Sequence, residues 1–196
     1  MADKKTNVVF KGITPAGIAT WAWLDKPDNS EYGKGKFKCA LKLEKGDEKN
    51  DAFARKIIDL HKAAKGKKDT VPVKDGDAMA EDNEKRESMR GFWVLTAKTN
   101  KKPDQVDAKK KPLAQTARSG DLVKLNIAAA EFDTGANKGV TLYLHAVQLL
   151  ERRALSAADA FDEEDEYAAD TASAETSESD DSDDRGDSSG SDDEDF

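Results

Sequence analysis

The sequence predicts a small, mainly β barrel with one inserted amphipathic helix and an acidic C-terminal tail. Three observations support this fold class. Five segments alternate apolar and polar residues with a period of two, one segment has helical periodicity, and residues 154–196 are rich in acidic residues. A chain of 196 residues has room for one ordinary domain with appendages.

The five expected strands lie at residues 18–24, 34–44, 91–99, 120–130 and 139–150. In the first, Trp21 and Trp23 share one face, with Thr20, Ala22 and Leu24 on the other. Lysines alternate with apolar residues in the second, and the short segment NVVF near the start is a candidate extra strand. Five strands and one helix indicate a partly open barrel of the oligonucleotide/oligosaccharide-binding (OB) type. A β-sandwich with an inserted helix fits the same pattern.

The expected helix lies within residues 47–66, between the second and third strands, where apolar residues recur from Phe53 to Ala64 at helical spacing. Either Asp47 or Asn50 is suited to cap its start, and a glycine follows its end. The helix is therefore amphipathic, and it is expected to cover the barrel.

Two basic, turn-rich stretches at residues 65–90 and 98–120 are expected to be long loops. After residue 153 the chain consists largely of Asp, Glu, Ser and Ala, so it cannot bury enough apolar surface to offset its ordering entropy. We therefore expect an OB-type domain at residues 1–153 and a disordered acidic tail at residues 154–196.

The net charge of −8 averages two segments of opposite sign. Residues 154–196 contain 18 Asp and Glu against one Arg, a net of −17. Subtraction from the totals of 32 basic and 40 acidic residues leaves 31 and 22 in residues 1–153, a net of +9. A basic body with an acidic tail indicates interaction with nucleic acid.

The single cysteine, Cys39, excludes a disulfide within this chain and is expected to be a buried, inert thiol. The N-terminal segment lacks the apolar stretch of a signal peptide, and no apolar run approaches the length of a membrane helix. The chain is therefore expected to be soluble and intracellular, with no membrane association.

Residues suited to catalysis or metal binding are few. His61 and His145 lie far apart without a nucleophile at a recognisable spacing, and His61 is expected to have a surface or helix-packing role. Four carboxylates in the segment VKDGDAMAED lack the spacing of a calcium loop. We expect no catalytic residues, metal or cofactor. A metal-dependent nuclease that uses Asp75 and Asp77 remains an alternative.

Binding of single strands requires cations for phosphates and flat aromatic faces for bases. The sequence places both kinds of residue in the same segments. The candidate contacts are Trp21, Trp23, Tyr32, Lys34, Lys36, Lys38, Lys42, Trp93, Lys98, Lys101, Lys102, Lys109, Lys110, Lys111, Arg118, Lys124 and Tyr143. By contrast, Phe37, Phe53 and Phe92 are expected in the core. An RNA-binding module and an acidic DNA-mimic or chaperone-like protein remain alternatives.

Several segments, in this order along residues 8–152, resemble one known family. They are TWAWLDKPD, GKGKFKCALKL, VPVKDGD, GFWVLTAKTNKKPDQVD, SGD and KGVTLYLHAVQLLE. The chain resembles the single-stranded DNA-binding proteins of tailed phages of the T-seven-like podovirus type. The resemblance implies an OB-fold core with an inserted helix. It also implies sequence-independent binding of single-stranded DNA in phage replication and recombination, in the cytoplasm of the infected bacterium.

The acidic tail that ends in phenylalanine also matches that family. The resemblance implies that the tail competes with DNA and contacts the phage DNA polymerase and helicase/primase, and it leaves a homodimer open. The implied contact residues are Asp192, Asp193, Glu194, Asp195 and Phe196. In one departure, Phe132 is retained before the final strand, but Ala130 stands where a second aromatic residue is expected.

Overall fold

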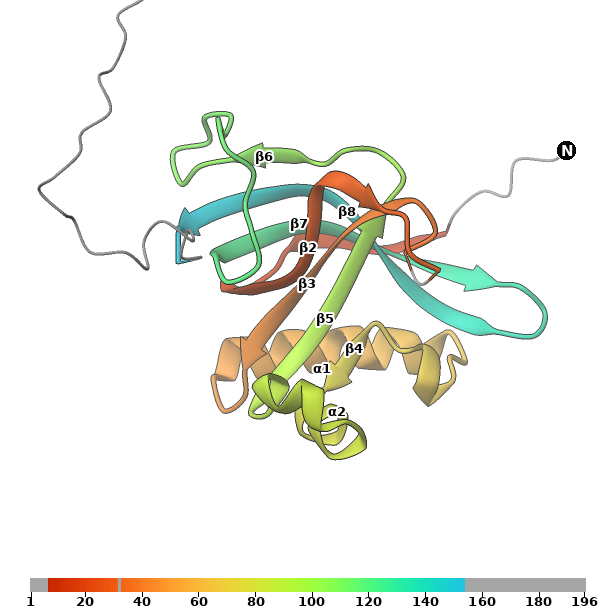
Figure 1. Ribbon diagram of the computed structural model, residues 1–196. Coiled ribbons are helices and arrows are strands. Elements are labelled where there is room, and N and C mark those ends of the chain that lie inside the picture. The colour runs from red at the N-terminus through yellow and green to blue at the C-terminus, as the bar shows by residue number, and fades with distance from the viewer. Residues whose placement is uncertain (1–6, 32, 154–196) are drawn as a thin grey trace, which may run out of the picture. The chain divides into compact units, whose positions relative to one another are not determined.

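The computed structural model describes residues 7–31 and 33–153 (Figure 1). A barrel is formed by the strands β2 (Gly17–Asp28), β3 (Lys36–Glu44), β5 (Phe92–Thr99), β8 (Lys138–Glu151) and β7 (Leu122–Asp133). Neighbours in this order are hydrogen-bonded, and β7 returns to β2. All pairs are antiparallel except β5 with β8. The structure confirms the five predicted strands and an OB-like barrel, not the sandwich alternative.

Three shorter strands extend this barrel. β1 (Val8–Ile13) pairs with β7, as the segment NVVF suggested, and β6 (Asp104–Val106) pairs in parallel with β8. β4 (Val73–Asp75) pairs with β5. Neither β4 nor β6 was predicted, because three residues are too few to show a period of two.

The barrel core is built from the inward residues of the alternating strands. Leu41, Leu95, Leu125 and Leu142 are at most 1% exposed and belong to one hydrophobic cluster. Cys39 is also buried in this cluster, and burial raises the pKa of its thiol to about 12. The thiol therefore stays protonated at neutral pH, which agrees with the expected inert cysteine.

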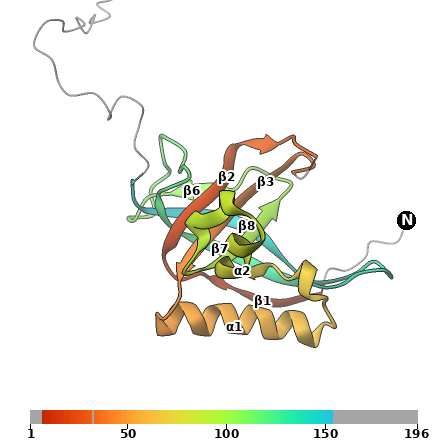
Figure 2. The same ribbon diagram turned by 60° about the horizontal axis from the view of Figure 1, so that its bottom comes forward.

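α1 (Glu48–Ala63) crosses one end of the barrel (Figures 1 and 2). The Asp47 side chain accepts a hydrogen bond from Asn50 N at 2.9 Å, so Asp47 is the N-cap. His61 is buried at the other end of the helix. Its Nδ1 accepts from Val140 N at 3.0 Å and its Nε2 lies 2.9 Å from Lys67 O, so the ring carries its proton on Nε2. Of the two roles expected for His61, the structure shows packing and not a surface position.

The stretch at residues 65–90 was expected to be a long loop, and this expectation is wrong. It contains the 3₁₀ turn η1 (Lys68–Thr70), β4, α2 (Gly76–Asp82) and the 3₁₀ segment η2 (Glu84–Met89). Met79 and Met89 from this stretch pack on the outer face of the sheet, against Ala40 and Val94. The apolar residues that drive this packing are too sparse to give a periodic signal.

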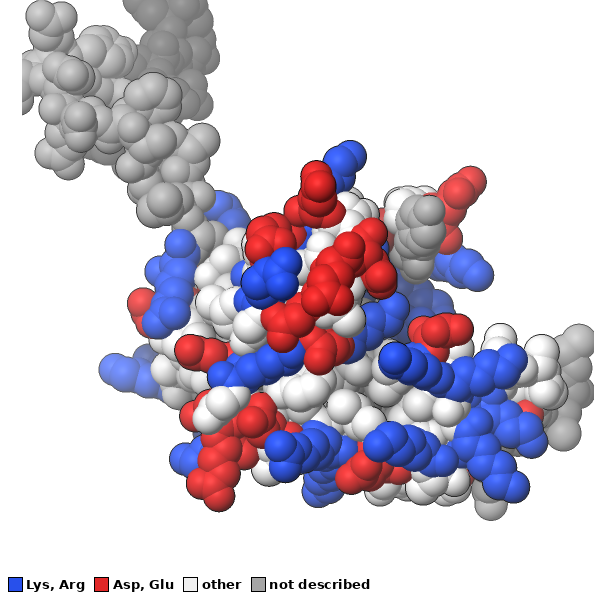
Figure 3. Space-filling view, turned by 90° about the horizontal axis from the view of Figure 1, so that it is seen from below, with Lys and Arg blue, Asp and Glu red and all other residues white. Residues whose placement is uncertain are grey.

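The helices therefore lie at one end of the barrel, and the opposite ends of β3 and β5 have no such cover (Figure 1). Seen from the helical side, Lys and Arg side chains are interspersed with Asp and Glu (Figure 3). No helix among the described residues is long and apolar enough to cross a membrane. The predicted acidic tail at residues 154–196, including the five expected partner contacts, lies outside the described residues.

Candidate nucleic-acid interface

A β-bulge exposes both tryptophans of β2. Thr20 pairs with Ala40 of β3, but Trp23 pairs with Lys38, so β2 has one extra residue between these two pairs. Trp21 lies in the bulge with a φ of 46°, which is unusual for a bulky side chain. Trp21 and Trp23 are 40% and 44% exposed. Both indoles are thus exposed to solvent, and the extra residue places Thr20 on the same face of the sheet as Trp23, not on the opposite face as predicted.

A row of four paired residues crosses the open part of the sheet. Trp23 of β2 pairs with Lys38 of β3, Lys38 with Lys98 of β5, and Lys98 with Tyr143 of β8. Directly paired residues share a face of the sheet. With about 4.8 Å between neighbouring strands, the row spans about 14 Å and has an exposed aromatic residue at each end. We call these four residues the aromatic–lysine row.

The lysines of this region raise the positive potential around the row. Partial burial lowers the pKa of Lys98, and the ammonium groups of Lys36, Lys34 and Lys38 lower it further. Among the described residues, no carboxylate forms an ion pair with Lys34, Lys36 or Lys98. Like charges held together without acidic partners favour the binding of an anion such as phosphate.

Lys38 differs from its neighbours because it forms an ion pair with the buried Asp28. Hydrogen bonds from Lys38 and Ser30 lower the pKa of Asp28 to about 2. The carbonyl of Asp28 also accepts from Gly35 N at 2.9 Å. Asp28 thus stabilises the turn between β2 and β3, which carries Lys34 and leads into Lys36.

A hollow beside the row adds a further aromatic residue. It is lined by Lys36, Lys98, Lys101, Phe132 and Tyr143, together with polar residues of β5 and β8. Phe132 lies near the end of β7 and is half-buried. The family resemblance identified Phe132 as a retained aromatic residue before the final strand, but no sequence pattern indicated that it would lie beside the lysines. Ala130 is fully buried and contributes no surface here.

Two predicted contacts lie away from the row. Trp93 pairs with the buried Leu43, and its Nε1 donates to Asp51 Oδ1 of α1 at 2.8 Å. Lys42 Nζ donates to Ser88 O at 3.3 Å and lies 5.0 Å from the ring centroid of Phe92. Both side chains are thus engaged with the helical end of the barrel, and neither extends the row.

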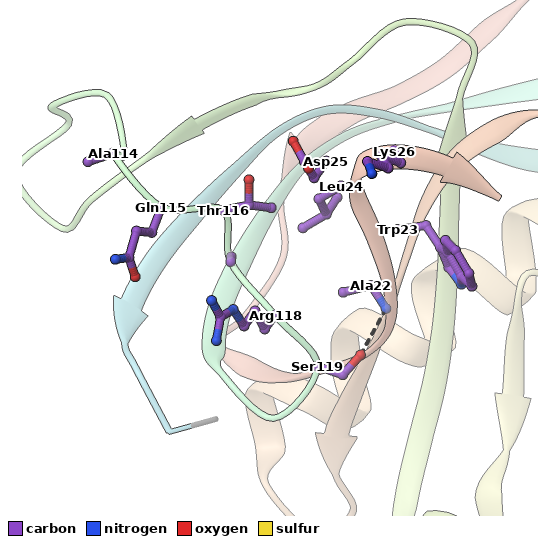
Figure 4. Close-up of a pocket in the computed structure, with 11 residues that line it drawn as sticks. Ala22, Trp23, Leu24, Asp25, Lys26, Ala114, Gln115, Thr116, Arg118 and Ser119 are labelled. Carbon is purple, nitrogen blue, oxygen red and sulfur yellow. Dashed lines mark hydrogen bonds between the residues drawn. The ribbon is translucent and has the colours of Figure 1, made fainter. Parts of the chain in front are cut away.

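The remaining predicted cations are spread over other surfaces. Lys102 Nζ donates to Asp25 Oδ1 at 2.7 Å, and Lys124 lines a hollow beside the start of α1. Lys109, Lys110 and Lys111 are exposed in the turn after β6. Arg118 lies in a loop behind β2, where it lines a hollow with Ala22 and Leu24 (Figure 4). Tyr32 lies outside the described residues.

The carboxylates of the nuclease alternative have structural partners. Lys45 Nζ lies 2.5 Å from Asp75 Oδ1 and 2.5 Å from Asp77 Oδ2. Asp75 also caps α2, and Asp77 accepts from Gly91 N at 2.7 Å. No group of three metal-ligating side chains occurs in the described part of the chain. These contacts account for both aspartates without a metal.

The chain was compared with known protein families and structures. A family model described as "Enterobacter phage Enc34, ssDNA-binding protein" matches residues 19–178. A search of curated proteins found no match.

Three solved structures show the same fold. A C-terminally truncated single-stranded DNA-binding protein of bacteriophage Enc34 is 20% identical, with a TM-score of 0.57, and the match covers 76% of this chain and 97% of that one. The Enc34 protein in complex with single-stranded DNA is 20% identical, with a TM-score of 0.55 and coverage of 78% and 98%. The single-stranded DNA-binding protein gp2.5 of bacteriophage T7 is 19% identical, with a TM-score of 0.52 and coverage of 82% and 100%.

Proposed function

Since the chain belongs to the family of the single-stranded DNA-binding protein of Enterobacter phage Enc34, we propose that it binds single-stranded DNA across the aromatic–lysine row. The observation that carries this proposal is the pairing of Trp23, Lys38, Lys98 and Tyr143 on four adjacent strands. Bases stack on the two rings, while Lys34, Lys36 and Lys98 neutralise the phosphates between them. No group in the row reads base edges, so binding is independent of sequence.

The proposal extends to the biological role. The protein coats single strands during phage DNA replication and recombination, in the cytoplasm of the infected bacterium. Its acidic tail recruits the phage DNA polymerase and helicase/primase, with Phe196 as an apolar anchor and Asp192, Asp193, Glu194 and Asp195 as the charged approach. The support for this role is the family resemblance and the composition of the tail. A homodimer would be recognised by a mass of twice the chain in solution.

The tail also regulates access to the row. A tethered segment has an effective concentration of about millimolar near its own domain. With a net charge of −17 against +9, it competes with the phosphates of DNA for the same lysines. Bound DNA displaces it and makes it available to partners.

A tryptophan fluorescence titration with oligo-dT tests the binding mode. The variant Trp93→Phe removes the indole that contacts α1, so Trp21 and Trp23 become the only reporters. We expect Trp93→Phe to bind DNA as the original chain does, with quenching of both exposed indoles. Absence of quenching together with absence of a gel shift would contradict the proposal.

Single substitutions then locate the stacking rings. In the Trp93→Phe background, Trp23→Ala and Tyr143→Ala should each weaken binding about 5- to 150-fold, because stacking contributes about 1–3 kcal/mol per base. An unchanged affinity for both variants would rule out the aromatic–lysine row as the contact surface. Competition with an RNA strand of matched sequence and length addresses the RNA alternative, which predicts preference for RNA.

A further inference from the structure

We propose that Ser119 is a positioning residue for base stacking, because its hydroxyl holds the bulge that turns Trp21 and Trp23 outward. This inference rests on the proposed function. Ser119 is not part of the aromatic–lysine row and was not among the predicted contacts. Its side chain reaches β2 from behind, where Ser119 Oγ accepts a hydrogen bond from Ala22 N at 3.0 Å (Figure 4).

The bulge decides which side of the sheet the two indoles occupy. Ala19 is 1% exposed and faces the core, opposite the buried Leu41. With unbroken alternation, Trp21 and Trp23 would have the same parity as Ala19 and would also face inward. The extra residue exchanges the two faces for the residues that follow it. Trp23 therefore pairs with Lys38 on the outer face, and Ala22 packs against the core.

This backbone conformation needs support from outside β2. The φ of 46° at Trp21 places a bulky residue in the left-handed region, a strained conformation that persists only where surrounding contacts enforce it. The bulge also takes the N–H of Ala22 out of the register between β2 and β3. Ser119 Oγ supplies the acceptor that this N–H requires.

The loop that carries Ser119 is itself held firmly against β2. Gly120 N donates to Ala19 O at 2.8 Å, and Ala19 N donates to Asp121 O at 2.8 Å. On the other side, Ala117 N donates to Gln105 Oε1 at 2.9 Å. Ser119 therefore lies between two fixed points, and its hydroxyl has a defined place opposite Ala22.

Figure 4 shows that the hydrogen bond between Ser119 and Ala22 and the ring of Trp23 lie in different places around β2. Ser119, Ala22 and Leu24 lie on the side of the loop, and the ring of Trp23, which also lines the hollow, lies on the other side of the β2 ribbon. A substitution at Ser119 thus removes no atom from the aromatic–lysine row. We expect a loss of DNA binding by such a variant to be transmitted through the backbone of β2, to which the Ser119 hydroxyl is hydrogen-bonded.

The test uses the full chain in the Trp93→Phe background, where only Trp21 and Trp23 report. Ser119→Ala should weaken binding of oligo-dT about 5-fold or more, which corresponds to the loss of a large part of one stacking contact, and should reduce the quenching at saturation. Ser119→Thr keeps a hydroxyl at this position, and we expect it to restore both quantities. The urea midpoint of unfolding is measured for each variant.

A double-mutant cycle distinguishes positioning from general damage. If Ser119 acts through the two indoles, Ser119→Ala should have no further effect on affinity in a chain that also carries Trp21→Ala and Trp23→Ala. Additive losses would overturn the inference, as would an affinity and quenching for Ser119→Ala equal to those of its parent. A parent that shows neither quenching nor DNA binding would instead overturn the proposed function.

If Ser119→Ala does not fold, the Ser119→Thr and Trp21→Gly variants are used to test the inference. Glycine adopts a positive φ without strain, so Trp21→Gly keeps the bulge while removing one ring. The combination of Trp21→Gly with Ser119→Ala should then fold and should retain the quenching of Trp23. Loss of Trp23 quenching in this variant, where the strain of the bulge is relieved, would contradict the inference, as would failure of Ser119→Thr to bind DNA.

Discussion

At the scale of a single residue, Lys98 is a lysine whose charged form is disfavoured by its surroundings in the folded protein. It pairs with Lys38 and with Tyr143, and its own pKa is lowered by partial burial and by Lys36, Lys34 and Lys38. A folded-state pKa below the ordinary value means that the fold disfavours the charged form. The charge at this position therefore works against folding.

Removal of the Lys98 charge should weaken DNA binding without lowering the stability of the fold. We expect Lys98→Gln to weaken binding of oligo-dT and to reduce the slope of log K against log salt by about 0.7, the value for one phosphate contact on a single strand. The thermal midpoint of unfolding should stay the same or rise, since repulsion is relieved. Titrations at several salt concentrations and thermal melts measure both effects.

Lys124→Gln is the matched control for this prediction. Lys124 lies on β7, beside the start of α1, and is not part of the aromatic–lysine row. Lys124→Gln removes one positive charge, as Lys98→Gln does, so the two variants have the same net charge. Equal losses of affinity for the two variants would show that overall charge, and not the lysine cluster, controls binding.

At the scale of elements, one buried side chain connects α1 with β8. His61 accepts from Val140 N near the start of β8, and its Nε2 donates to the carbonyl of Lys67. A Cβ on Gly139 would lie only 2.3 Å from His61 Cε1, so the ring is packed directly against the strand. β8 also supplies Tyr143, and this contact helps to position the start of β8, next to the turn of the β7–β8 hairpin.

His61→Ala should destabilise the domain substantially. The buried N–H of Val140 loses its acceptor, which costs about 1–3 kcal/mol, and the vacated space adds to this loss. His145→Ala provides a control on the same strand, because His145 is exposed and its removal should change the free energy of unfolding by less than about 0.5 kcal/mol. Urea denaturation of both variants measures the difference. Equal stability would contradict the assigned role of His61.

The whole molecule combines a basic body with an acidic segment of opposite charge. Arg152 and Arg153, the last described residues, contact the loop behind β2 and Asp121 just before β7. Arg152 Nη2 donates to Gln115 O at 3.1 Å, and Arg153 N donates to Asp121 Oδ1 at 3.0 Å. The tail is therefore tethered to the domain that carries the aromatic–lysine row. This attachment supports the proposed competition between tail and DNA.

Removal of residues 154–196 should tighten binding of single-stranded DNA, most clearly at low salt, where charge is screened least. Deletion of Phe196 alone keeps the net charge of −17, so DNA affinity should stay near that of the full chain, while binding to the phage polymerase or helicase is lost. Parallel DNA titrations and partner pull-downs test these two variants. Unchanged or weaker DNA binding by the truncated chain would contradict the competition.

The five barrel strands, the helix and many inward residues of the strands could be predicted from the sequence, whereas Phe37 and Phe92, which were expected in the core, do not belong to its buried cluster. A period of two assigns alternate residues of a strand to opposite faces, and inward residues such as Leu41 and Leu125 must be apolar whatever surrounds them. The N-cap of α1 could also be predicted, because the Asp47 side chain accepts a hydrogen bond from a backbone N–H only three residues away. These signals are local, so they survive without knowledge of the tertiary structure.

The aromatic residues of the candidate site could not be identified without the long-range pairing of the strands. Trp23 and Tyr143 are far apart in the sequence, and they join one row because β2, β3, β5 and β8 are neighbours. Trp93 looked equivalent, but α1 occupies its side of the sheet. The bulge at Trp21 likewise depends on a loop nearly a hundred residues away. A local pattern can assign a residue to a face, but long-range pairing determines whether that face is covered, charged or open.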